Sequence, residues 1–307
     1  MRRHSHALLI AAAALSSATA ATPEVRATAK KLSDAHKDAI VWLSVLSKTS
    51  LSAEGDVPPQ IQSALAGQSQ ENKSETTGTI VDAGGLIVTA LGGLDKSSLV
   101  DGQSVNTPMG AIKLRANTEV KEVKVITADG SELPADLVLK DEDLGLAFIK
   151  IRMDSEEAKG VELKAIDLAD SAAGEILDDC IALGRLSEAL NREPSLSTSE
   201  ISGITTKPRT FYRVATDAVG CPVFLANGKL LGLSVVRKPK SSTPLDANTE
   251  LGTVILPASE VVKVAAQAKD AKPEPPKPAA EAEAKEDAKP EGDKPAEGAA
   301  PEEKPAQ

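Results

Sequence analysis

Short hydrophobic runs, separated by polar and turn-forming residues, recur along the chain. The run at 38–48 is rich in β-branched residues and partly alternates between apolar and polar positions, which predicts a strand. Residues 77–91 form two such runs about a glycine-containing turn at 82–85. Further runs occur at 122–128, 133–140 and 143–151. Many short strands with turn signals about 8–12 residues apart indicate an all-β protein.

The strongest local signal lies in the segment 216–236, where two apolar runs flank the turn Ala226-Asn227-Gly228-Lys229. Asparagine and glycine both tolerate a positive φ, so Asn-Gly between two apolar runs favours a β-hairpin.

Other segments lack the strand pattern. Residues 25–37 are polar with interspersed alanine and leucine, which predicts a short helix within an N-terminal segment at 21–37. Residues 49–75 and 95–119 are polar, and we expect them to be irregular insertions. From 269 to 307 the composition changes to Pro, Ala, Glu and Lys. Such a segment buries too little apolar surface to offset chain entropy, so we expect a disordered tail.

The first 20 residues have the pattern of a signal peptide. Arg2 and Arg3 precede a short apolar run at 7–15, and Ala18-Thr19-Ala20 is an A-x-A cleavage site. The apolar run is too short to span a bilayer, and a retained anchor is the alternative. No later stretch is long and apolar enough for a membrane span. We therefore expect an exported protein, periplasmic or extracellular, without an integral membrane span after cleavage.

The composition limits the classes of binding partner and the kinds of metal or cofactor site that we expect. The net charge of −10 argues against nucleic acid as a partner and provides no basic patch for an anionic membrane. Aromatic residues make up only 2% of the chain, so Val, Ile, Leu and Ala must form the core. The three histidines are His4, His6 and His36, and the first two leave with the signal peptide. No Cys/His cluster has metal-ligand spacing, and we expect neither a metal nor a cofactor.

The segment 216–236 resembles the part of HtrA/Deg-type trypsin-like serine proteases that carries the nucleophile. In that family a Thr-Asp pair leads through a glycine-rich loop to Ser-Gly-Gly-Pro, an apolar strand, a turn and a second strand. This chain has Val219-Gly220-Cys221-Pro222 instead, and the preceding loop is shortened to Ala218. The resemblance therefore places Val219 at the nucleophile.

The other two triad positions are also substituted in this resemblance. Aligning the family's φ-φ-Thr motif on Thr89 places Gly92 at the histidine. Matching the family's Asp-φ-Ala-φ-φ-Lys-φ motif to residues 146–151 places Gly145 at the aspartate. Asp143 lies two residues earlier on the same strand face, displaced by about 7 Å.

The resemblance covers roughly 38–268 and implies a chymotrypsin-type double six-stranded β-barrel. The first barrel is expected at about 38–160 and the second at about 174–262, closed by a strand at 253–257 and a short final helix. Without the resemblance, the pattern would indicate only a β-rich sandwich or barrel. Many family members carry a PDZ domain after the barrels, where this sequence has the polar tail.

The residues at the three positions cannot perform triad chemistry. A triad needs a base beside the nucleophile, a group that orients the base, and oxyanion donors. Glycine carries no proton-transfer group and valine no nucleophile, so we predict no catalytic residue. Three substitutes are disfavoured: a Cys221 nucleophile, His36 folded back into the cleft rather than a solvated helix residue, and a dyad of Ser234 with a lysine.

We therefore expect a pseudoprotease that binds unfolded or extended peptide segments or a protein of the cell envelope. The alternatives are an active serine endopeptidase of the HtrA/Deg type and a structural envelope component that acts through its tail.

The resemblance also implies a disulfide between Cys180 and Cys221. They are the only cysteines, and in this fold the two strands that carry them run close together. Two separate buried thiols are the alternative.

Overall fold

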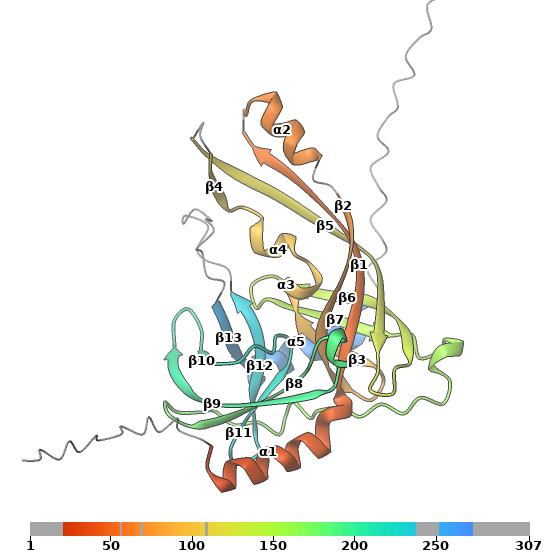
Figure 1. The fold of residues 1–307 in the computed structure, drawn as a ribbon, viewed down its shortest axis with the longest axis vertical. Helices are drawn as coiled ribbons and strands as arrows, with labels where there is room; N and C mark the ends of the chain where they lie inside the picture. The colour runs from red at the N-terminus through yellow and green to blue at the C-terminus, as the bar shows by residue number, and fades with distance from the viewer. Residues whose placement is uncertain (1–20, 56, 68–69, 108–109, 238–251, 273–307) are drawn as a thin grey trace, which may run out of the picture. The chain divides into compact units, whose positions relative to one another are not determined.

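The computed structural model describes residues 21–272 except 56, 68–69, 108–109 and 238–251 (Figure 1). The predicted signal peptide, and the predicted tail beyond residue 272, lie outside the described residues.

Seven antiparallel strands in the first half of the chain form one sheet. Their order is β1-β2-β3-β7-β6-β5-β4, and a further pairing of β1 with β5 closes six of them into a barrel, with β4 added at β5. The strands are β1 (Ile40–Glu54), β2 (Gln70–Asp82), β3 (Leu86–Ala90), β4 (Ser104–Thr107), β5 (Gly110–Ile126), β6 (Glu132–Asp141) and β7 (Leu146–Ile151).

Six strands in the second half close a second barrel in the order β10-β13-β12-β11-β8-β9. They are β8 (Asp179–Arg185), β9 (Pro194–Thr205), β10 (Phe211–Val214), β11 (Pro222–Leu225), β12 (Leu230–Arg237) and β13 (Gly252–Pro257). The two six-stranded barrels confirm the predicted chymotrypsin-type double β-barrel. The Asn-Gly hairpin joins β11 to β12, with Gly228 at φ 88°.

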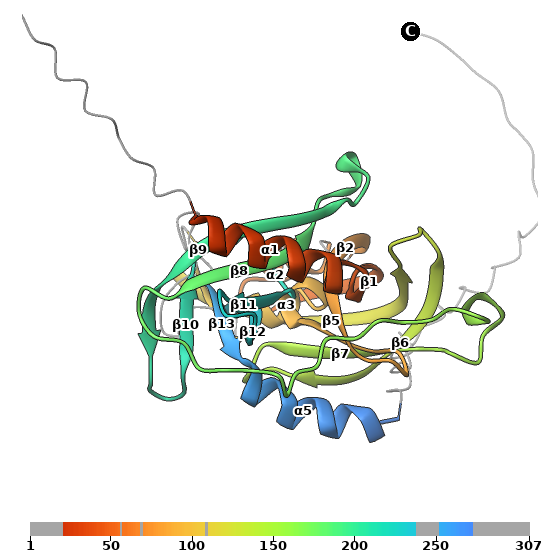
Figure 2. The ribbon, with the colours of Figure 1, turned by 90° about the horizontal axis from the view of Figure 1, so that it is seen from below.

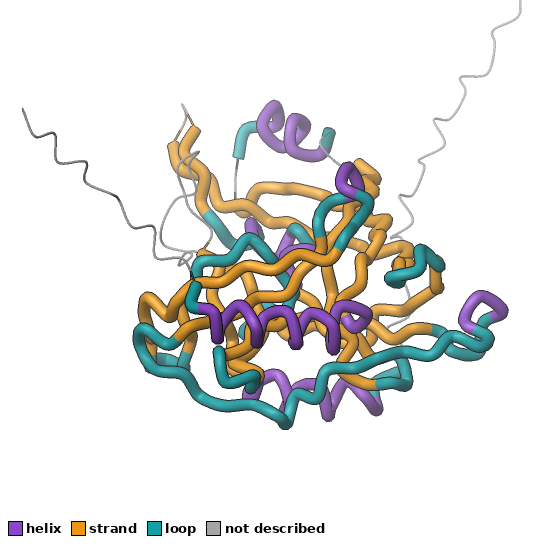
Figure 3. Tube along the Cα trace, turned by 60° about the horizontal axis from the view of Figure 1, so that its bottom comes forward, coloured by secondary structure: helices purple, strands orange, loops and turns teal. Residues whose placement is uncertain are grey.

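The longer helices lie around these strands (Figure 3). The α-helices are α1 (Pro23–His36), α2 (Pro59–Ala66), α3 (Leu91–Leu94), α4 (Ser97–Val100) and α5 (Ala258–Asp270). Single 3₁₀ turns occur at Lys37–Ala39, Glu156–Ala158 and Glu188–Leu190. Among the described residues, none of the helices is both long and apolar enough to cross a bilayer.

Helix α1 begins where its sequence favours a start. Thr22 is the N-cap and accepts a hydrogen bond from the Val25 amide, and a proline occupies the first helical turn. Val25, Ala29 and Leu32 recur on one face and are buried against the second barrel. The helices α1 and α5 flank the strands of the second barrel (Figure 2).

Separate apolar clusters fill each barrel and the space between the barrels. The strand β3 contributes side chains to two of these clusters. Its five residues are all buried; Ile87 belongs to the core of the first barrel, whereas Leu86 and Val88 belong to the core between the barrels. Successive side chains of a strand point to opposite faces, so a strand with both faces covered is almost entirely apolar. Its one polar side chain, Thr89, donates a hydrogen bond to the Thr77 carbonyl.

The two expected irregular insertions are instead largely ordered. The strand β1 continues to Glu54, β2 starts at Gln70, and α2 lies between them. The segment 95–119 forms α4, β4 and the first half of β5. Together they extend the first barrel as a long ribbon (Figure 1). The prediction was wrong because main-chain pairing between β1 and β5 orders strands whose side chains are mostly polar and of which few are buried.

Arg185 at the end of β8 ties the second barrel to the N-terminal segment. Its guanidinium donates to the carbonyl oxygens of Ile40, Lys37 (2.8 Å) and Arg192 (3.0 Å). The planar fork of arginine suits several acceptors at once, which a lysine ammonium on a flexible stem does not.

We therefore expect Arg185→Lys to lower the free energy of unfolding by about 1 kcal/mol, because carbonyl groups that are at most partly buried lose their donors. Urea unfolding followed by circular dichroism measures this change. Arg26→Lys, at an exposed position on α1, is the control. Equal stability of the two variants would contradict the role given to Arg185.

Candidate functional site

Two of the three triad-like positions meet in the structure. Gly92 lies in α3, directly after β3, and Gly145 lies directly before β7. Because β3 and β7 are hydrogen-bonded neighbours, the segments that continue them are adjacent. The Leu91 amide donates to the Gly145 carbonyl at 2.8 Å, so the two glycines lie side by side.

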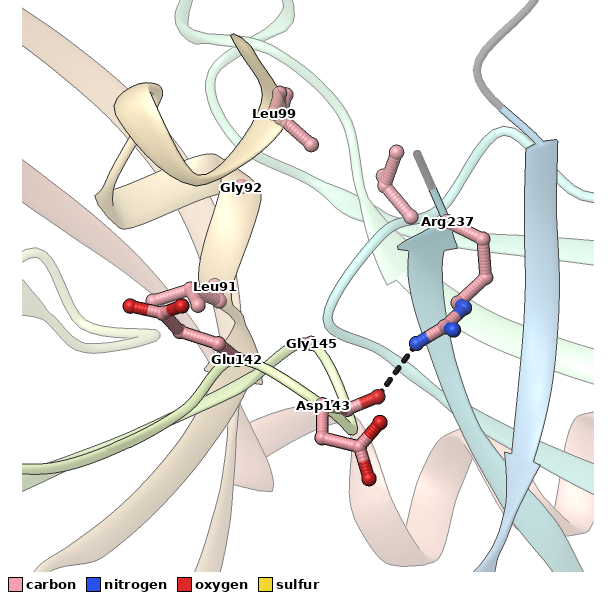
Figure 4. A pocket seen from close by; sticks show the side chains of 8 residues that line it. Leu91, Gly92, Leu99, Glu142, Asp143, Gly145 and Arg237 are labelled. Atoms are coloured by element: carbon pink, nitrogen blue, oxygen red, sulfur yellow. Dashed lines mark hydrogen bonds between the residues drawn. The ribbon is translucent and has the colours of Figure 1, made fainter. Parts of the chain in front are cut away.

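Both glycines line a pocket of about 180 Å³ between the barrels (Figure 4). The first barrel contributes most of its wall and the end of β12 contributes the rest. Its lining residues are Leu91, Gly92, Leu99, Glu142, Asp143, Gly145, Val236 and Arg237.

Val219 lies in the β10–β11 loop, which is fixed against the first barrel. The Thr77 hydroxyl donates to the Val219 carbonyl, and the Thr79 hydroxyl donates to the Gly220 carbonyl at 3.0 Å. A side chain on Gly220 would lie 2.8 Å from the Thr89 hydroxyl. The nucleophile-like loop therefore keeps a close contact with β2 and β3, although Val219 itself does not line the pocket.

An apolar side chain occupies the space beside Gly92. A Cβ atom on Gly92 would lie 2.9 Å from the Leu99 Cδ2 atom, which is closer than real side chains approach. Leu99 comes from α4, inside the segment that the sequence pattern marked as an irregular insertion. Sequence reasoning therefore missed this residue, and no signal in a polar segment indicated it.

A buried carboxylate holds α4 in place. Asp95 accepts hydrogen bonds from the Lys140 ammonium at 2.7 Å and the Ser97 amide at 3.1 Å. Burial raises the pKa of Asp95, but Lys140, Ser97 and Thr118 together outweigh it, so the pKa lies below its usual value. The Asp95–Lys140 ion pair thus anchors the segment that places Leu99 over Gly92.

Gly145 has a backbone that disfavours a side chain. Its φ is +72°, and a Cβ atom would lie 3.4 Å from the Val236 carbonyl oxygen. A residue other than glycine is strained in this region of φ. An aspartate at this position would therefore have a strained backbone.

Asp143, the displaced carboxylate, is bound to the second barrel. Its carboxylate forms an ion pair with Arg209, and its carbonyl accepts from Arg237 at 2.5 Å (Figure 4). The Arg237 guanidinium also lies 5.0 Å from the centre of the Phe211 ring, a cation–π arrangement. Asp143 thus links the barrels across the cleft instead of orienting a base.

Two of the three substitute groups, Ser234 and His36, already form other contacts within the protein. The Ser234 hydroxyl is fully buried and bonds both the amide and the carbonyl of Cys221, each at 3.1 Å. His36 is not the solvated residue that we expected: it is half-buried, its ring stacks on Phe224 with centroids 5.4 Å apart, and burial lowers its pKa.

The cysteines correct the expected disulfide, because Cys180 and Cys221 are both free, buried thiols. Cys180 pairs with Leu225 across β8 and β11. Cys221 lies four positions before Leu225, which is about 13 Å along a strand and beyond the reach of a disulfide. Cys180 faces the interior of the second barrel, whereas Cys221 faces the core between the barrels.

Neither thiol is activated. Burial raises the pKa of Cys180 to about 12 and that of Cys221 to about 11. The thiolate is the reactive form, so at neutral pH both side chains remain protonated.

Iodoacetamide should therefore modify neither cysteine in the native protein at neutral pH. After unfolding without reductant it should modify both Cys180 and Cys221, and intact-protein mass spectrometry counts the added groups. Two cysteines that stay unmodified until a reductant is added would contradict this assignment.

No group of three or more His, Cys, Asp or Glu side chains in the described part of the chain could hold a metal ion.

The model of the trypsin-like peptidase domain family matches residues 76–233. The match covers just over half of the chain, runs from β2 to β12 and includes Gly92, Gly145 and Val219. The chain therefore belongs to the trypsin-like peptidase domain family. No curated protein matches it.

The packing of Leu99 predicts that a histidine cannot simply be restored. We expect Gly92→His to lower the free energy of unfolding by about 2 kcal/mol through overpacking. Leu99→Ala in the same chain should recover part of this loss, because it vacates the space. Thermal unfolding of the single and double variants measures the coupling.

The control for this test is Gly252→His, since nothing lies within 4 Å of a Cβ atom there. An equal cost at both glycines, with no recovery by Leu99→Ala, would show that Leu99 does not fill the histidine site.

Proposed function

We propose that this protein is a non-catalytic relative of the HtrA/Deg-type peptidases that binds peptide or protein segments at the cleft between its barrels. The observation that carries the proposal is the packing of Leu99 against Gly92. It supports a site in which an apolar side chain occupies the space beside the position of a base.

The positions of the histidines in the sequence support the proposed loss of catalysis independently. The last histidine in the sequence is His36, which stacks on Phe224. Peptide hydrolysis by a serine-type site needs a base beside the nucleophile. Valine at position 219 offers no hydroxyl, and glycine at positions 92 and 145 offers neither a base nor a group to orient one.

The intact cleft supports binding. Walls from both barrels still enclose the pocket, and Thr77 and Thr79 keep the β10–β11 loop in contact with the first barrel. Extended segments can associate with β-sheet proteins through main-chain hydrogen bonds and side-chain pockets. Neither kind of contact depends on the triad.

Export is part of the proposal and rests on the first 20 residues. Their charged, apolar and A-x-A regions support a mature protein that starts near Ala21 in the periplasm or outside the cell. Its partners there are proposed to be unfolded or extended segments or an envelope protein. N-terminal sequencing tests this: a secreted protein that retains Met1 would contradict it.

We expect the mature protein to bind reduced, unfolded casein without cleaving it and to react with no fluorophosphonate probe. Val219→Ser should change neither result, because the added hydroxyl has no base beside it. Gel electrophoresis of the casein and in-gel detection of the probe are the measurements.

The contradictory outcome is hydrolysis or labelling that survives purification and disappears on substitution of a single residue of this chain. That result would favour an active endopeptidase instead.

A further inference from the structure

The pocket lies where the two glycines at the triad-like positions, Gly92 and Gly145, meet the end of β12. Gly92 and Gly145 form part of its wall, and its volume is about 180 Å³. A water molecule occupies about 30 Å³ in the liquid, and pockets for drug-sized ligands start at about 300 Å³. The pocket therefore has room for one side chain of a bound segment rather than for a larger ligand.

Its apolar wall suits a chain of methylene groups. Leu91 and Leu99 lie on the side of the first barrel and Val236 on the side of the second. Long cationic side chains bury their aliphatic stem against apolar surface and keep the charged head at a polar rim.

The charged side chains at the rim of the pocket determine whether a cationic or an anionic ligand side chain is favoured. Among the acids of the loop 141–145, Asp141 accepts a hydrogen bond from the Leu144 amide at 2.9 Å, and Asp143 pairs with Arg209. Glu142 is exposed, and no ion pair joins it to another described residue. Its side chain points to a different side of the loop from that of Asp143 (Figure 4).

The two arginine side chains of the site already form contacts within the protein. Arg209 neutralises Asp143, and Arg237 donates to the Asp143 carbonyl and covers the Phe211 ring. A carboxylate ligand would have to compete with these contacts. A cationic ligand meets the uncompensated carboxylate of Glu142.

We propose that this pocket accepts a lysine or arginine side chain of the bound segment, with Glu142 as its counter-ion. This inference rests on the proposed binding function and specifies its ligand: a segment with a basic residue at the position that faces the former triad.

The test uses the full chain and dye-labelled, blocked alanine–valine peptides whose central residue is lysine, norleucine or glutamate. Fluorescence anisotropy at low salt measures each affinity. The lysine peptide should bind about fivefold more tightly than the norleucine peptide, as expected for a partly exposed ion pair. High salt should reduce this preference.

Glu142→Gln should abolish the preference for lysine and leave the affinity for norleucine unchanged. Glu142→Lys should reverse the preference toward glutamate. The control is Glu162→Gln, at an exposed position away from the pocket, which should keep the preference. Thermal unfolding confirms that each variant is folded.

The outcomes separate the two proposals. Equal affinity for the three peptides, or equal loss in Glu142→Gln and Glu162→Gln, overturns the assignment of the pocket and leaves peptide binding intact. Failure of all three peptides to bind overturns both.

Discussion

The contact between two threonine hydroxyls and the β10–β11 loop is the constraint on which the cleft depends. Thr77 and Thr79 of the first barrel bond the carbonyls of Val219 and Gly220 in the second. The Thr89 hydroxyl donates to the Thr77 carbonyl at 2.6 Å and so joins β3 to the same network. These hydrogen bonds hold the β10–β11 loop of the second barrel against the first barrel. Breaking any one of them would leave an unpaired polar group. They involve main-chain atoms of the nucleophile-like loop, so they persist when its side chains change.

The cleft therefore keeps its walls, although the residues at its triad-like positions are Gly92, Gly145 and Val219. At Gly92 the space beside the backbone is occupied by Leu99, which forms part of the pocket wall. At Gly145 the backbone has moved into a region of φ that favours glycine, and its space remains part of the pocket. The link from Asp143 to Arg209 and Arg237 closes the side of the cleft where a triad aspartate would stand. The apolar wall and the Glu142 carboxylate, which forms no ion pair with another described residue, support the proposed binding role.

The sequence predicted those features that depend on local apolar pattern or on a required positive φ. The Asn227-Gly228 turn and the strand at 146–151 belong to this group, and they located the triad-like positions. The ordered ribbon at 49–75 and 95–119 could not be predicted, because main-chain pairing stabilises it without a periodic apolar face. Leu99 was missed for the same reason. The predicted disulfide between Cys180 and Cys221 was wrong because the closeness of two strands does not determine which of their residues face each other. The two thiols lie in different cores.

The most direct test of a cleft that binds without cleaving is a heteronuclear NMR titration of the mature, ¹⁵N-labelled protein with the lysine-containing peptide. The structure predicts amide shifts concentrated in 91–99, 142–145 and 236–237, and a peptide whose mass is unchanged after the titration. Shifts confined to other surfaces, or a cleaved peptide, would contradict the account.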